Sequence, residues 1–224
     1  PYAEFILRVG QHQKVCINVA DGTMHHAALD LIINSDYALS INDLDGILDR
    51  ITFYYNPTND AWCRDHGPAF LINETEKSKA IVDWGYNAWG DKYPPYDLDD
   101  VIPTLIGKQL DLPVFHPGIV MEGGSVEFNG KGTIMTTKAC LLNKNRNPHL
   151  SQFEIEQYLI EYYGGEQILW LDEGIVGDDT DGHIDDMTRF VDADTVVTVV
   201  ESNRSDENYD ILKDNIKLLK KMRL

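Results

Sequence analysis

The stretch SQFEIEQYLIEYYGGEQILWL, residues 151–171, predicts a helix followed by a short strand. Its first part spaces apolar residues as a helix does, and QILWL is a short apolar run. The loop DEGIVGDDTDGH, rich in acids and glycine, comes next. Two strand-like segments, IDDMTRFV and TVVTVV, then flank the turn DAD. This order of helix, strand, loop and strand pair indicates an α/β protein.

The same order of elements occurs in two earlier segments. The loop residues Asp65, Glu122 and His183 follow one another at intervals of about sixty residues. A repeated α/β unit arranged around an axis would bring such loops together at one end. One body is the simplest organisation, and a last helix is expected at 208–222. The earlier expected helices are 24–33, 41–50 and 99–110, and the earlier expected strands are ITFYYN (51–56), AFLI, AIVDW, LPVFHP, SVEFN and TIMTTKACLL.

The composition is that of a globular chain with a strong acidic excess. The 224 residues are 43% hydrophobic and 25% charged, and the formal net charge is −18. This charge argues against nucleic acid as a partner, because phosphate binding needs a basic surface. It would concentrate small cations, although net charge alone more often serves solubility. No apolar run approaches the roughly 18 residues of a membrane helix, so no membrane partner is expected.

Three widely spaced cysteines, Cys16, Cys63 and Cys140, argue against a disulfide framework. They fit a reducing compartment, and we expect a cytoplasmic protein. None of them forms a C-x-x-C pair, which argues against a structural zinc site. Cys16 and Cys140 lie in apolar, strand-like runs, where a buried and unreactive thiol is expected.

The loop DAWCRDHGP, residues 60–68, contains Trp62, Arg64 and Asp65. A tryptophan near an aspartate could stack on a planar cation while the carboxylate accepts its hydrogen bonds. The alternative is a loop in which Arg64 and an aspartate form a structural ion pair.

The stretch MEGGSVEF, residues 121–128, places Glu122 before two glycines. A Gly-Gly pair permits a positive φ or a close approach of the backbone to a ligand. The alternative is an ordinary tight turn with a solvated glutamate.

The acidic stretch GDDTDGHIDD, residues 177–186, is the most informative loop because it holds His183 and Asp185. On an extended strand these two side chains would point the same way. A histidine titrates near neutrality and suits proton transfer, and nearby carboxylates raise its pKa. A calcium loop ending at Gly182 would need aspartate at Gly177 and an acid at Thr188. Zinc would need more histidine or thiolate than this stretch supplies.

Two further loops are polar or aromatic. In LLNKNRNP, residues 141–148, Arg146 could offset acidic charge, but a structural loop is the favoured interpretation. The stretch DWGYNAWG, residues 83–90, could line a pocket or cover the core.

Four of these motifs together resemble the agmatine deiminase family, a branch of the bacterial peptidyl-arginine deiminase-like, guanidino-modifying enzymes. They are WCRDHGP (62–68), EGG (122–124), N-x-NRNP (143–148) and GDDTDGHID (177–185). The resemblance implies a five-bladed α/β propeller (pentein) of ββαβ modules, with about three blades in this chain. It spans nearly the whole chain.

The resemblance also implies a role for each motif. Asp65 and Asp185 are the expected guanidinium-binding carboxylates, and His183 is the expected general acid/base. Trp62 and Glu122 are expected to line the substrate pocket. In this family a cysteine thiolate attacks the guanidinium carbon, ammonia leaves, and water hydrolyses the covalent thiouronium. Neither a metal nor a cofactor is implied.

This sequence departs from the family pattern at the nucleophilic cysteine. In the family it lies near the C-terminus, in a glycine-rich stretch ending in His-Cys, and none of the three cysteines matches it. Cys63 is close to Asp65, and a neighbouring carboxylate disfavours the thiolate. We therefore expect one catalytic domain over 1–224 that is incomplete at both ends and inactive alone.

The expected reaction is hydrolysis of agmatine to N-carbamoylputrescine and ammonia, a step of putrescine biosynthesis. Deimination of peptidyl-arginine is the alternative within the same class. A non-catalytic guanidino or polyamine binder and a metal-binding acidic protein are the alternatives outside it. The expected partner is a small guanidino cation or an arginine side chain, and a homo-oligomer is left open.

Overall fold

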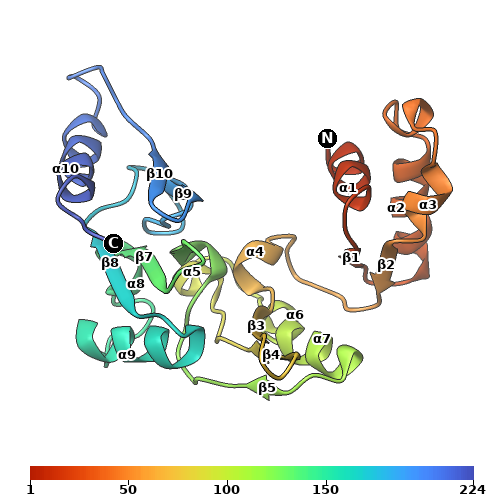
Figure 1. Cartoon of the computed structure of the whole chain (residues 1–224), viewed down its shortest axis with the longest axis horizontal. Coiled ribbons are helices and arrows are strands. Elements are labelled where there is room, and N and C mark those ends of the chain that lie inside the picture. The colour runs from red at the N-terminus through yellow and green to blue at the C-terminus, as the bar shows by residue number, and fades with distance from the viewer. The chain divides into compact units, whose positions relative to one another are not determined.

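The computed structural model describes residues 1–224, which form two compact units, 1–59 and 60–224. Helices and short strands alternate along both units, so the fold is mixed α/β (Figure 1). No helix has the length and apolar character that a membrane span requires.

The first unit is a small α/β layer. Strands β1 (Val15–Asn18) and β2 (Ile51–Tyr54) pair in parallel. The Asp21 carboxylate accepts a hydrogen bond from the Met24 N–H and caps the next helix. The remaining elements are α1 (Tyr2–Gly10), α2 (Gly22–Ile33), η1 (Ala38–Ser40) and α3 (Leu44–Leu48), and their core holds Leu7, Ile32, Ala38 and Ile47.

The second unit contains two three-stranded sheets of the same topology. In each sheet two consecutive strands pair antiparallel, and a third strand adds in parallel after a helical crossover. The sheets are β3 (Ala69–Asn73), β4 (Ser78–Val82), β5 (Val114–Phe115), and β6 (Val126–Phe128), β7 (Thr133–Thr137), β8 (Gln167–Leu171). The crossover helices are α5 (Ala88–Asp91), α6 (Asp97–Asp100) and α7 (Ile102–Leu110), and α8 (Lys138–Leu141) and α9 (Gln152–Tyr163).

Helix α9 shows why the opening stretch of sequence folds as it does. Ser151 and Glu154 form a reciprocal capping box at its start. Gly164 ends the helix with a left-handed conformation, φ 68°. Ile155 and Leu159 are fully buried against a core that also contains strand and loop residues, namely Val82, Trp84, Ile119, Met121, Val126, Ile134, Cys140 and Leu141.

The recurring order predicted from the sequence is present. Strands β9 (Thr188–Asp192) and β10 (Thr195–Thr198) form the last antiparallel pair, and helix α10 (Tyr209–Leu219) follows. Each strand pair is preceded by a loop or a short helical turn, among them α4 (Cys63–His66) and η2 (Gly123–Ser125). The turns α4 and η2 pack against each other.

Two expectations about the cysteines were wrong. Cys16 is exposed on β1. Cys140 is buried as expected, but it lies on α8, because the strand ends at Thr137. The Thr137 hydroxyl accepts a hydrogen bond from the Cys140 N–H at 3.2 Å, which caps a helix where the sequence predicted a continuing strand.

Candidate active site

Asp65 lies at the centre of the candidate site. It sits on α4 with its carboxylate almost fully buried. The Gly124 N–H donates to Asp65 Oδ1 at 3.0 Å, and the Trp89 indole N–H donates to Oδ2 at 3.2 Å. Burial raises the pKa of Asp65 above its ordinary value, although His183 and the Gly124 N–H oppose the rise.

His183 and Asp185 lie beside Asp65. His183 Nδ1 is 3.7 Å from Asp65 Oδ1 and 3.8 Å from Asp185 Oδ1. The sequence predicted that both side chains point the same way because they share an extended strand. That explanation was wrong, because β9 begins only at Thr188. A loop aims the two side chains at the same place.

The Asp178 carboxylate holds this loop. It accepts hydrogen bonds from the Gly182 N–H at 2.8 Å and from the Thr180 N–H at 2.8 Å. The His183 N–H also points at it, at 3.3 Å. One aspartate of the acidic stretch therefore organises the backbone that carries His183.

Gly123 and Gly124 are required by close contact with the site. A Cβ on Gly124 would lie 2.4 Å from His183 Nδ1, 2.7 Å from Asp65 Oδ1 and 3.0 Å from Asp185 Oδ1. A Cβ on Gly123 would lie 2.0 Å from the Arg64 carbonyl oxygen. The bare backbone of η2 thus allows the three groups to converge.

Glu122 lies behind His183 and is fully buried. Its Oε1 accepts a hydrogen bond from Arg146 Nε at 2.6 Å, and its Oε2 is 3.9 Å from His183 Nε2. The Arg146 guanidinium also donates to Asp181 Oδ2 at 2.8 Å and to the Thr180 carbonyl at 2.9 Å. The imidazole therefore stands between Glu122 on one edge and Asp65 and Asp185 on the other.

These contacts set the charges of Glu122 and His183. Burial acts to raise the pKa of Glu122, but His183 and Arg146 outweigh it and hold that pKa below its usual value. Burial acts to lower the pKa of His183, but its contacts with Cys140 and Glu122 outweigh burial and raise that pKa to about 11. At neutral pH, Glu122 is a carboxylate and His183 an imidazolium.

A cavity of about 530 Å³ opens beside these residues. Its aromatic lining is Trp62, Trp89 and Tyr93, and Trp62 packs edge-on against Trp89. The acidic residues in its lining are Asp60, Asp65, Asp179, Asp185 and Asp186. An elongated cation with an apolar chain matches this combination of acids and aromatic rings.

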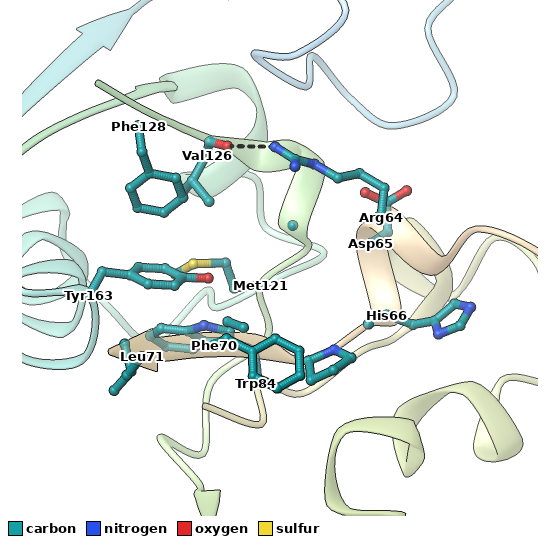
Figure 2. Close-up of a pocket in the computed structure, with 14 residues that line it drawn as sticks. Arg64, Asp65, His66, Phe70, Leu71, Trp84, Met121, Val126, Phe128 and Tyr163 are labelled. Carbon is teal, nitrogen blue, oxygen red and sulfur yellow. Dashed lines mark hydrogen bonds between the residues drawn. The ribbon is translucent and has the colours of Figure 1, made fainter. Parts of the chain in front are cut away.

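A second cavity, of about 290 Å³, also adjoins Asp65. Figure 2 shows its apolar lining, with Phe128, Tyr163 and Trp84 facing the space and Met121 between them. Arg64 lies at its edge and donates to the Val126 carbonyl at 3.5 Å.

Part of the acidic stretch is paired with the protein's own groups. Asp181 binds both Lys92, at 2.6 Å, and Arg146. Asp179 accepts a hydrogen bond from the Tyr93 hydroxyl at 2.7 Å. Arg64 Nε is 3.6 Å from Asp185 Oδ2, so the ion pair considered from the sequence is present. Asp65 has no arginine or lysine partner and remains available to an external cation.

The sequence did not identify Arg146 as a site residue, because a polar loop gives no sign of where its arginine ends up. The sequence did not decide whether the DWGYNAWG loop lines a pocket or covers the core. In the structure the Trp89 indole N–H of this loop donates a hydrogen bond to Asp65. Glu122 was expected in the pocket wall, whereas here it contacts the far edge of the imidazole. The pairing of Glu122 with Arg146 could have been suspected only from the need to neutralise a buried acid.

Fold and site together define a class: α/β proteins whose acidic loops converge with one histidine on a cavity that suits a flat cation. A profile of the Porphyromonas-type peptidyl-arginine deiminase family matches residues 1–224. The chain belongs to this family.

Curated relatives and solved structures agree with this assignment. A Legionella pneumophila (strain Paris) protein named "Putative agmatine deiminase" is 51% identical over 164 residues, which are 73% of this chain and 47% of the relative. A C. jejuni agmatine deiminase with substrate bound superposes with a TM-score of 0.84 at 32% identity, covering 98% of this chain and 61% of that one. An Enterococcus faecalis agmatine deiminase superposes with a TM-score of 0.84 at 30% identity, covering 98% of this chain and 57% of that one. The chain spans about half the length of the curated relatives it matches.

Replacing Arg146 with methionine is expected to lower the free energy of unfolding by about 3–5 kcal/mol, because Glu122 would stay buried without its counter-charge. Lys138→Met is the matched control. The Lys138–Asp172 pair has the same 2.6 Å separation but is half exposed, so its loss should cost at most about 1 kcal/mol. Urea unfolding of the two variants measures both values, and equal losses would contradict the structural role of Arg146.

The raised pKa of His183 predicts a dependence of stability on pH. Because the folded protein binds this proton more tightly than the unfolded chain, the stabilisation is complete below pH 6.5 and is lost as the pH rises toward about 11. The difference in unfolding free energy between the wild type and His183→Gln should fall by about 1.4 kcal/mol per pH unit in this window. Urea unfolding at several pH values tests this, and a difference independent of pH would contradict it.

Proposed function

We propose that this chain is the guanidinium-binding part of an agmatine deiminase, which hydrolyses agmatine to N-carbamoylputrescine and ammonia. The observation that carries the proposal is the convergence of Asp65, His183 and Asp185 around Gly124. The agmatine deiminases among the solved relatives support the same reaction.

The two aspartates would hold the substrate. A guanidinium is planar, delocalised and always charged at neutral pH, and its edges match carboxylates. Burial raises the pKa of both Asp65 and Asp185, so a cation that binds between them stabilises their ionised forms. Trp62 would pack on the cation or its alkyl chain.

His183 would transfer the protons. As an imidazolium it can donate a proton to the departing amino group, so that ammonia leaves as the thiolate adduct collapses to the thiouronium. The neutral imidazole can then accept a proton from the water that attacks the thiouronium carbon. The thiolate leaves as the remaining hydroxyl proton passes to solvent and the ureido carbonyl forms. Glu122, which contacts Nε2, would position the ring from behind.

We propose that the nucleophilic thiolate comes from outside residues 1–224. Cys16 belongs to the first unit, and Cys63 is exposed on α4. Cys140 is fully buried and lies in a cluster with Glu122 and His183. The chain alone would then bind a guanidinium without turning it over.

The same proposal extends to the arrangement of the sheets as blades of a propeller. The two sheets of equal topology and the β9–β10 pair would be blades of a five-bladed α/β propeller, and residues 1–224 would form one incomplete catalytic domain. The apolar cavity of Figure 2 would be covered by the remaining part. Phe70 and Phe128, both in its lining, are 49% and 40% exposed, as such a covered surface requires.

Deimination of peptidyl-arginine is the second candidate, and the description of the matching family favours it. An arginine in a peptide presents the same guanidinium but has peptide groups where agmatine has a free amine. The acids Asp60, Asp179 and Asp186 in the cavity favour a substrate with a second positive charge.

The test uses the complete gene product that contains these residues. Agmatine and a blocked arginine peptide are supplied separately, and ammonia and the ureido product are measured. We expect ammonia and N-carbamoylputrescine from agmatine, at a kcat/KM well above that for the peptide. Turnover of the peptide alone would support the second candidate. Binding of agmatine without any ammonia would contradict an enzymatic role and favour a binder.

A further inference from the structure

Three buried side chains converge behind His183. Glu122 precedes η2, Cys140 lies on α8, and His183 lies in the loop before β9. One donor atom from each, a carboxylate oxygen, a sulfur and a ring nitrogen, all lie within 4.8 Å of one another. The three side chains thus form a compact donor set inside the protein.

Two of these donors lack hydrogen-bond partners. Glu122 Oε2 and His183 Nε2 are buried and make no hydrogen bond within 3.5 Å. The residues are 0% and 2% exposed, and the two atoms are 3.9 Å apart. Most buried polar atoms are paired, so two unpaired buried atoms this close together call for a partner.

The donor types match zinc. Thiolate, imidazole and carboxylate are its usual ligands, and three protein ligands leave a fourth position for water. Ligand atoms of a tetrahedral zinc site lie about 3.3–3.7 Å apart. Here Glu122 Oε2 and His183 Nε2 are 3.9 Å apart, and the three donor atoms all lie within 4.8 Å of one another.

The surroundings of the donors support the same assignment. Arg146 Nε fixes the other oxygen of Glu122 at 2.6 Å. His183 Nδ1 faces the carboxylates of Asp65 and Asp185 at 3.7 and 3.8 Å. A carboxylate on one ring nitrogen and a metal on the other is the common arrangement of metal-binding histidines.

We propose that Glu122, Cys140 and His183 bind one Zn²⁺ ion. The thiol and the imidazolium Nε2 each give up one proton to solvent when the S–Zn and N–Zn bonds form, and neither oxidation nor reduction is involved. From the sequence, zinc was set aside because the acidic stretch offers a single histidine. The fold supplies the thiol and the carboxylate from two other segments.

Bound zinc would block proton transfer by His183, a consequence that rests on the proposed function. With Nε2 coordinated, the ring keeps its proton on Nδ1 and has no lone pair to accept another. The nitrogen facing Asp65 and Asp185 could then donate a hydrogen bond but could not act as a base. Zinc would act as a reversible inhibitor that occupies the rear of the site.

Cobalt binding tests the site without reference to activity. Co²⁺ added to the complete gene product should give thiolate-to-cobalt charge-transfer absorption, and competition with a chromophoric chelator gives the zinc affinity. In Cys140→Ser the part of the absorption due to this thiolate should vanish, and zinc affinity should fall by more than about 100-fold. Cys63→Ser, which removes an exposed thiol of the same unit, is the matched control. It should retain both the cobalt absorption and the zinc affinity.

Unchanged absorption and affinity in Cys140→Ser would overturn the proposal, as would the absence of any cobalt signal in the wild type. His183→Asn gives a second test if the serine variant folds poorly, because it keeps the thiol and should weaken zinc binding by a similar factor. Far-ultraviolet circular dichroism establishes that each variant is folded.

Inhibition is measured separately. Zinc should suppress ammonia release, a chelator should restore it, and Cys140→Ser should raise the inhibitory concentration by more than about 100-fold. If zinc binds by the cobalt criterion but leaves turnover unchanged, the inhibitory consequence is wrong. If no turnover is found without zinc, the proposed function fails while the metal site stands on its spectroscopy.

Discussion

Replacing His183 with glutamine in the complete gene product is expected to reduce kcat for agmatine by about 10³-fold or more. General acid and base catalysis contributes about 10²–10⁴-fold, and here one imidazole would serve both the departure of ammonia and the attack of water. Glutamine has a similar length and can hydrogen-bond, but it cannot carry the proton that the raised pKa keeps on His183. Steady-state ammonia release measures the effect.

The KM for agmatine separates catalysis from binding in this experiment. The carboxylates of Asp65 and Asp185 remain in the variant, so KM should change by less than about tenfold. His26→Gln is the control, because His26 is an exposed histidine of the first unit. A His183→Gln enzyme with near-normal kcat would remove His183 from the chemistry.

Replacing Gly124 with alanine is expected to lower kcat/KM for agmatine by about 10²-fold or more. The added Cβ would lie 2.4 Å from His183 Nδ1 and 2.7 Å from Asp65 Oδ1, so at least one of these groups must move. A displacement of about 1 Å in a reacting geometry can cost about 10²-fold in rate. Steady-state kinetics on agmatine measures the loss.

The matched control is Gly22→Ala, because nothing lies within 4 Å of a Cβ built on Gly22. Its kcat/KM should stay within about twofold of the wild type. A Gly124→Ala protein with full activity would mean that the space around η2 is not limiting. Unfolding midpoints of both variants show whether lost activity reflects lost structure.

The order of elements was predictable from the sequence because it depends on local signals. The apolar spacing and the capping residues of α9 are local, and the structure follows them closely. The end of β7 was missed, since the apolar character of TIMTTKACLL continues into α8 and only the Thr137 cap marks the change.

The convergence of Asp65 with His183 and Asp185 was anticipated from the loop repeat and the family resemblance. The pairing of Arg146 with Glu122 was not anticipated. Arg146 and Cys140 reach the imidazole region through tertiary packing, and no spacing rule relates them to the acidic stretch. Local sequence thus predicts which loops carry polar groups, while long-range packing decides which groups face the cavity.

The most direct measurement is a crystal structure of the complete gene product with guanidinium, the flat cationic group of agmatine that the two aspartates would bind. We predict that its nitrogens lie within about 3.2 Å of carboxylate oxygens of both Asp65 and Asp185, with His183 beside them. A guanidinium bound elsewhere, with Asp185 still held by Arg64, would contradict the shared cation site.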